Sequence, residues 1–173
     1  MAKTDKKAAT ARSAAVEILQ QVLGEGAYTN IAVNKYLRSH ELSDMDRRLM
    51  TELVYGTVKA VGTIDWYLQQ CVTRPLDKID KLVLSILRIS VYQLLYMDKI
   101  PASAACNEAV NLARLFSHEG TAKFVNGVLR GLLRKKDSFT FPDKEKETAN
   151  YISLAMCHPR WLVKKWLKNY GRA

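Results

Sequence analysis

The sequence is poor in the residues that build disulfides and metal sites. Its three cysteines, Cys71, Cys106 and Cys157, are widely spaced and odd in number, which argues against a disulfide framework and against a zinc site. His40 and His118 have no partner at the spacing of metal ligands. We therefore expect no resident metal, and we expect a reducing compartment, the cytoplasm.

Long hydrophobic runs are also absent from the sequence. No apolar stretch approaches the roughly 20 residues that a membrane-spanning helix needs. The N-terminal segment is basic, but no apolar stretch with a cleavage site follows it, so it does not look like a secretory signal. The sequence thus predicts a protein without a membrane partner.

No arrangement of residues suits catalysis. Cys157 and His158 are adjacent, and adjacent side chains on a helix point about 100° apart, so they cannot form a nucleophile–base pair there. The turn at Gly24 and Gly26 ends a helix, whereas a dinucleotide-binding loop follows a strand and opens a helix. We expect no catalytic and no cofactor-binding residue in this chain.

Acidic residues are in short supply. The chain has 27 Lys and Arg against 17 Asp and Glu, which gives a net charge of +10. The basic excess is present both in residues 1–136 and in residues 137–173, so it is not one basic tail. This charge favours a polyanionic partner such as nucleic acid. A basic protein without such a partner is the alternative.

What the sequence does contain is a helical spacing of hydrophobic residues almost throughout. The run 82–95 is apolar nearly all round, which predicts a helix buried at the centre of the fold, with Asp77 or Asp80 as its cap. Ser43, with Asp46 three residues on, is predicted to cap an earlier helix.

Glycines and small polar residues predict where helices stop and start. Gly56 and Gly62 are expected to break the helix that begins after Ser43. After Pro101, Ser103 is expected to cap the next helix. The remaining expected boundaries are a stop at Gly120 and a cap at Thr121.

The resulting fold class is all-α, a compact bundle of six to seven helices. We expect a basic N-terminal arm over residues 1–10 and the helical bundle over residues 11–136. Residues 137–147 have no apolar period and contain a proline, so they are predicted to be a linker. Residues 148–173 are predicted to be the helical start of a further segment.

The stretch 123–136 is the most informative one. It carries one apolar stripe and one stripe of glycines and cations on the opposite side. Two glycines inside a helix cost about 2 kcal/mol relative to alanine, so something must approach the backbone there. A tightly packed neighbouring helix is one explanation, and a phosphate backbone along a groove of arginines is the other. The predicted RNA-binding residues are Lys6, Lys7, Arg12, Lys123, Arg130 and Arg134.

A single arginine lies within the apolar run of the central helix. Arg88 needs a partner if it is buried, and Glu108 is a candidate by its charge. We expect a structural ion pair here and not a catalytic dyad.

The chain resembles the NusB-like domain in three segments, in the family's order and spacing: LSDMDRRLMTELVYGTV (42–58), KLVLSILRISVYQLLYMDKIPASAACNEAVNLAR (81–114) and KFVNGVLRGLLR (123–134). The resemblance covers roughly residues 11–136. It implies an all-α bundle that binds RNA.

The NusB-like domain occurs in two settings. One is the stand-alone transcription antitermination factor, which binds RNA together with a ribosomal protein. The other is the N-terminal part of the ribosomal RNA small subunit methyltransferase B family. DRRLMTELVYGTVK (46–59) is similar to the second form, and Arg130 departs from the acidic residue that we associate with the first. HPRWLVKKWLKNYG (158–171) resembles the segment that joins the domain to the methyltransferase body, which favours the second setting.

Membership of that methyltransferase family would imply a division of labour. S-adenosylmethionine donates a methyl group to cytosine C5 of 16S rRNA after a cysteine in a Pro-Cys motif attacks the base. Cys71, Cys106 and Cys157 each lack the preceding proline. The resemblance therefore implies that this chain binds and positions RNA, whereas catalysis and cofactor binding belong to its own C-terminal methyltransferase domain, with Trp161 and Trp166 at the junction.

Overall fold

The protein is built from helices. The structure, a computed structural model, describes residues 8–171, and within that range it contains eight α-helices and no strand. The helices are α1 (Ala11–Leu19), α2 (Thr29–Ser39), α3 (Asp44–Cys71), α4 (Lys81–Tyr96), α5 (Ala102–Phe116), α6 (Glu119–Lys135), α7 (Thr148–Ala155) and α8 (Arg160–Tyr170). The expected all-α fold is confirmed. None of the helices within residues 8–171 combines the length and the apolar character needed to cross a bilayer.

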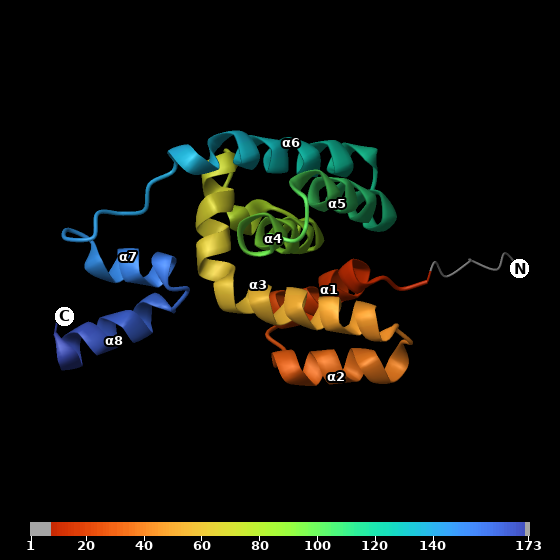
Figure 1. Cartoon of the computed structure of the whole chain (residues 1–173), viewed down its shortest axis with the longest axis horizontal. Coiled ribbons are helices and arrows are strands. Elements are labelled where there is room, and N and C mark those ends of the chain that lie inside the picture. Colours follow the sequence, from red (N-terminus) through yellow and green to blue (C-terminus); the bar gives the residue numbers. More distant parts are fainter. Residues whose placement is uncertain (1–7, 172–173) are drawn as a thin grey trace, which may run out of the picture.

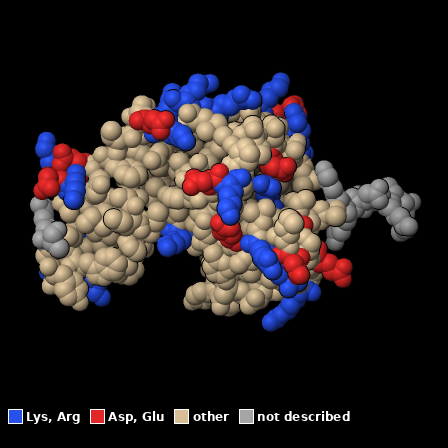
Figure 2. Space-filling model, in the orientation of Figure 1, with Lys and Arg blue, Asp and Glu red and all other residues tan. Residues whose placement is uncertain are grey.

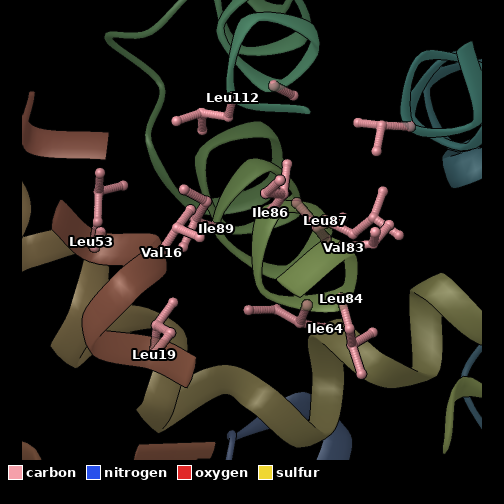
Figure 3. Close-up of a cluster of buried hydrophobic side chains, with 14 of the residues drawn as sticks. Val16, Leu19, Leu53, Ile64, Val83, Leu84, Ile86, Leu87, Ile89 and Leu112 are labelled. Atoms are coloured by element: carbon pink, nitrogen blue, oxygen red, sulfur yellow. The ribbon is translucent and has the colours of Figure 1, made fainter. Parts of the chain in front are cut away.

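Helix α4 is the centre of the bundle. Asp80 caps it, because one carboxylate oxygen accepts hydrogen bonds from the backbone N–H groups of Leu82 (2.9 Å) and Val83 (3.3 Å). Helices α1, α3, α5 and α6 all pack against α4, so its side chains are buried around most of its circumference (Figures 1 and 3). The predicted central helix is confirmed, and its burial supplies much of the apolar area that stabilises the fold.

Helix α3 does not break where its glycines predicted a break. Ser43 caps it as expected, but the helix then continues through Gly56 and Gly62 to Cys71. Figure 1 shows that the first and second halves of α3 run in different directions, so the chain bends there without leaving the helix. Gly56 is needed for packing, since a Cβ atom at this position would overlap the ring of Tyr92.

The starts of α5 and α6 differ from their predicted positions. Helix α6 begins at Glu119, and a ring nitrogen of His118 accepts the hydrogen bond from the backbone N–H of Thr121 at 3.3 Å. Gly120 therefore lies in the first turn of α6 and does not stop the helix before it. Helix α5 begins at Ala102, directly after Pro101, so Ser103 is not its cap.

The buried arginine of α4 has a different partner from the one predicted. Arg88 donates two hydrogen bonds to the carboxylate of Asp65 on α3, each at 2.8 Å. Both side chains are largely covered, with exposed fractions of 15% and 28%. The prediction of Glu108 was wrong because α4 packs its arginine against the second half of α3. The ion pair joins the two helices that form the middle of the bundle.

The segment after α6 returns to α3. Phe139 and Phe141 pack against the rings of Trp66 and Tyr67, with ring centroids 5.0–6.3 Å apart. Further along, the hydroxyl of Thr63 donates a hydrogen bond of 2.7 Å to the carbonyl of Leu154 in α7. Helix α7 thus lies beside the second half of α3, and α8 packs on α7, at one end of the molecule (Figure 1).

Candidate nucleic-acid interface

The outer face of α6 carries three of the six predicted RNA-binding residues. Its inner side packs into the core through Val125, Val128, Leu129 and Leu132, all buried. Because side chains three or four residues apart share a face of a helix, the outer side presents Lys123, Arg130 and Arg134, which are all exposed. Figure 2 shows a row of Lys and Arg side chains along this edge, over the helix at the top of Figure 1.

The two glycines of α6 open onto this face. A Cβ atom at Gly127 would meet nothing within 4 Å, and one at Gly131 would meet only the end of the Arg134 side chain, at 3.9 Å. The tightly packed neighbouring helix, one of the two explanations for these glycines, is therefore wrong. The backbone of α6 is accessible beside the cations, so an extended anion could approach it closely.

The charged residues of α6 are almost all positive. Glu119 is the single acidic residue of this helix, and it lies at the N-terminal end in an ion pair of 2.8 Å with Arg114. The hydrogen bond from Arg114 lowers the pKa of the Glu119 carboxyl. Arg130 donates a hydrogen bond only to the neutral amide oxygen of Asn126, at 3.1 Å. Its positive charge is therefore not neutralised by that contact.

Of the other predicted residues, the structure describes only Arg12, and it does not lie at α6. Arg12 is half-buried on α1, and its Nε donates a hydrogen bond of 2.9 Å to the buried side chain of Gln93 on α4. Figure 1 shows α1 and α6 on different sides of α4. Lys6 and Lys7 lie outside the described residues. Arg12 thus helps to hold α1 on α4, and the sequence alone did not indicate that role.

The structure adds two cations that the sequence did not single out. Arg74 lies over the ring of Phe124 on α6, with 5.2 Å between its guanidinium carbon and the ring centroid. Arg74 and Lys78 line a pocket of about 430 Å³ together with His118, Thr121 and Phe124. The short connection between α3 and α4 therefore brings two more cations beside α6, together with the carboxylate of Asp80, which caps α4 and lines the same pocket. The one signal in the sequence for this contact is Phe124, an aromatic residue next to the cations of α6 that could accept a cation such as Arg74.

The cysteines are not arranged as nucleophiles. Burial raises the pKa of the Cys71 and Cys106 thiols, which disfavours the reactive thiolate. The sulfur of Cys157 lies 3.5 Å from the hydroxyl oxygens of both Thr63 and Tyr96. The ring of His158 packs instead against Trp166, with centroids 5.2 Å apart. Cys157 and His158 therefore point to different partners.

Curated relatives match nearly the whole chain. Two are named probable ribosomal RNA small subunit methyltransferase B, from Bacillus subtilis (strain 168) and from Synechocystis sp. (strain ATCC 27184 / PCC 6803 / Kazusa). They are 39% and 37% identical to it over 166 and 167 residues. Each match covers 95% of this chain but 36% of the relative. The chain thus spans about a third of the length of these relatives.

Solved structures share the fold at low sequence identity. The antitermination factors NusB and NusE in complex with dsRNA match at a TM-score of 0.65 and 21% identity, over 72% of this chain and 93% of that chain. NusB from Aquifex aeolicus matches at 0.65 and 20%, over 79% and 96%. The crystal structure of PH0851 matches at 0.69 and 18%, over 96% and 37%. A likeness over 96% of the chain reaches beyond the bundle into α7 and α8.

A family model described as the NusB family matches residues 9–134. This range contains the complete bundle from α1 to nearly the end of α6, including the outer face of α6. Because the match covers most of the chain and agrees with the fold, the chain belongs to the NusB family.

Proposed function

We propose that the chain is the RNA-binding, N-terminal domain of an S-adenosylmethionine-dependent 16S rRNA cytosine-C5 methyltransferase. In this role it positions rRNA for a catalytic domain outside these 173 residues. The observation that carries the proposal is the open face of α6, where Lys123, Arg130 and Arg134 are exposed beside two glycines without close neighbours. The parts of the proposal that concern rRNA and methyl transfer rest on the names of the relatives.

The α6 surface is suited to phosphates more than to bases. Cations in a row along a helix match the repeating charge of a nucleic-acid backbone, and each contact releases counterions. Base recognition on single strands needs exposed aromatic rings, and the ring nearest to this surface, Phe124, is covered by Arg74. Binding at α6 should therefore depend strongly on salt and little on sequence.

We propose that the RNA surface consists of the α6 cations together with the two cations of the α3–α4 connection. The predicted residues Lys6, Lys7 and Arg12 stay in the proposal as a separate contribution from the N-terminal arm and α1. Because Arg12 also holds α1 on α4, its replacement would change both binding and packing. The cleaner targets are therefore Arg130 and Arg134.

S-adenosylmethionine is proposed for the intact protein and not for this chain. Residues 8–171 contain helices only and provide no strand followed by a glycine-rich loop. The turn at Gly24 and Gly26 follows a π-helical turn and leads into α2. These residues do not fit the cofactor, so the methyl transfer belongs to the proposed catalytic domain. We propose the cytoplasm as the place of action, because that is where its proposed rRNA substrate lies.

The alternative is a stand-alone antitermination factor that binds RNA with a ribosomal protein. It is favoured by the shared fold with NusB in its complex with NusE and dsRNA. The gene distinguishes the two functions. A reading frame that continues into a glycine-rich loop and a Pro-Cys motif supports the methyltransferase, and a reading frame without them supports the factor.

The proposed function is tested by the salt dependence of RNA binding. If Arg74, Lys78, Lys123, Arg130 and Arg134 each neutralise one phosphate, the slope of log affinity against log salt on duplex RNA is expected to be about −4.5. Fluorescence anisotropy with a labelled small-subunit rRNA hairpin, from about 50 to about 200 mM salt, measures this slope. Absence of binding at the lowest salt would contradict RNA binding, and an affinity that salt does not change would contradict binding through phosphates.

A further inference from the structure

Helix α8 carries a second cationic surface that the α6 surface does not explain. The sequence from Thr148 onward contains no Asp or Glu, whereas α8 contains Arg160, Lys164, Lys165 and Lys168. All four side chains are exposed. Within residues 8–171 the ion pairs are Arg88 with Asp65 and Arg114 with Glu119, so no cation of α8 is in an ion pair there, although Glu147 lines one pocket with Arg160.

An exposed tryptophan lies one turn before these lysines on the same helix. Trp161 has an exposed fraction of 67%. Lys164, Lys165 and Lys168 follow it by three, four and seven residues, which places them on the same face of the helix. Figure 2 shows basic side chains at the lower edge of α8, away from α7. The indole ring is thus bordered by cations.

The two tryptophans of α8 have different surroundings. Trp166 packs edge-on against the ring of His158, at the turn between α7 and α8. Val163, which is 1% exposed, fixes the inner side of α8 in the protein. Trp161 lies on the other side of the helix from Val163 and is left to solvent. The prediction that both tryptophans lie at the junction to a further domain stays a prediction, and Trp161 has no aromatic partner within the described residues.

The lysines beside Trp161 favour a nucleic-acid partner over a protein partner. Cores of protein–protein interfaces are depleted in lysine, because burying an ammonium group without a partner is costly. Single-stranded nucleic acid needs the opposite combination, a ring on which a base stacks and cations for the flanking phosphates. A base inside a duplex is already stacked on its neighbours, so its face is not available to Trp161.

We propose that Trp161, Lys164, Lys165 and Lys168 form a binding site for single-stranded RNA, in which one unpaired base stacks on the indole ring. The proposal rests on the proposed function and extends it. The α6 surface holds RNA by its phosphates, and the α8 site holds an unpaired segment of the same RNA. The domain then recognises a junction between paired and unpaired RNA.

The test uses the full chain and an oligouridylate as the single-stranded probe. Trp161→Ala is expected to weaken its binding about tenfold, within the range for one stacked base, and to leave the salt slope unchanged because no charge is lost. RNA-dependent quenching of tryptophan fluorescence should disappear in the same variant. Replacing Lys164, Lys165 and Lys168 with Gln should instead reduce the slope by about 2.

Matched controls separate this site from the α6 surface. Tyr170→Ala removes another exposed aromatic ring from α8, on the side opposite Trp161, and should change neither the affinity nor the quenching. Unchanged oligouridylate binding and quenching in Trp161→Ala, with duplex binding intact, overturns the α8 site alone and assigns this face to a protein partner. If the unaltered chain shows no salt-dependent binding to duplex RNA, the proposed function itself is overturned.

Discussion

Replacing both Arg130 and Arg134 with Gln is expected to lower the affinity for a duplex RNA roughly fiftyfold at about 0.1 M salt. Both guanidinium groups are exposed on the open side of α6, and neither has a carboxylate partner among residues 8–171. Losing two phosphate contacts should also reduce the salt slope by about 1.8. Glutamine is shorter than arginine but has a similar helix propensity, so the helix itself should persist.

Fluorescence anisotropy over a salt series measures both quantities, and circular dichroism checks the helix content. The matched control is Lys35→Gln with Arg38→Gln on α2, which removes the same charge from a helix outside the proposed surface. This control should change affinity much less than the α6 variant. Equal losses in the two variants would mean that only net charge matters and that α6 is not the binding surface.

Asp65→Ala is expected to lower the free energy of unfolding by about 3 kcal/mol. The substitution leaves the guanidinium of Arg88, whose side chain is 15% exposed, largely buried without its bidentate partner. Urea unfolding followed by circular dichroism measures the change as a shift of the midpoint.

The pair of Arg114 and Glu119 is the natural comparison, because its shortest N–O distance is also 2.8 Å but its side chains are more than half exposed. Glu119→Ala should therefore leave the midpoint nearly unchanged. Replacing Asp65 and Arg88 together with Leu and Met should recover most of the lost stability. If Asp65→Ala and Glu119→Ala unfold at the same urea midpoint, the buried pair of Arg88 and Asp65 contributes no more to stability than the exposed pair.

Local signals in the sequence predicted the parts of the fold that depend on neighbouring residues. Ser43 and Asp80 cap their helices as expected, because a cap needs only its own side chain and the next few backbone N–H groups. The burial of α4 followed from its composition alone. The stripe of cations and glycines on α6 was visible for the same reason, since helical spacing fixes which residues share a face.

Contacts between distant residues were not accessible in this way. Asp65 and Glu108 carry the same charge, and nothing local decides which of them Arg88 meets. Arg74 reaches Phe124 only because α3, α4 and α6 pack together. The effect of Gly56 was misjudged for a related reason, because the glycine makes room for Tyr92 of another helix. In each case the deciding interaction is tertiary.

Nuclear magnetic resonance of the ¹⁵N-labelled chain, during titration with a small-subunit rRNA hairpin, shows whether RNA lies on the open face of α6. Gly127 and Gly131 report from the face itself, and Gly62 is an equally open helical glycine on α3. We expect the amide signals of Gly127 and Gly131 to shift on RNA binding and that of Gly62 to stay in place. Unmoved signals of Gly127 and Gly131 in a chain that binds the hairpin would contradict this expectation.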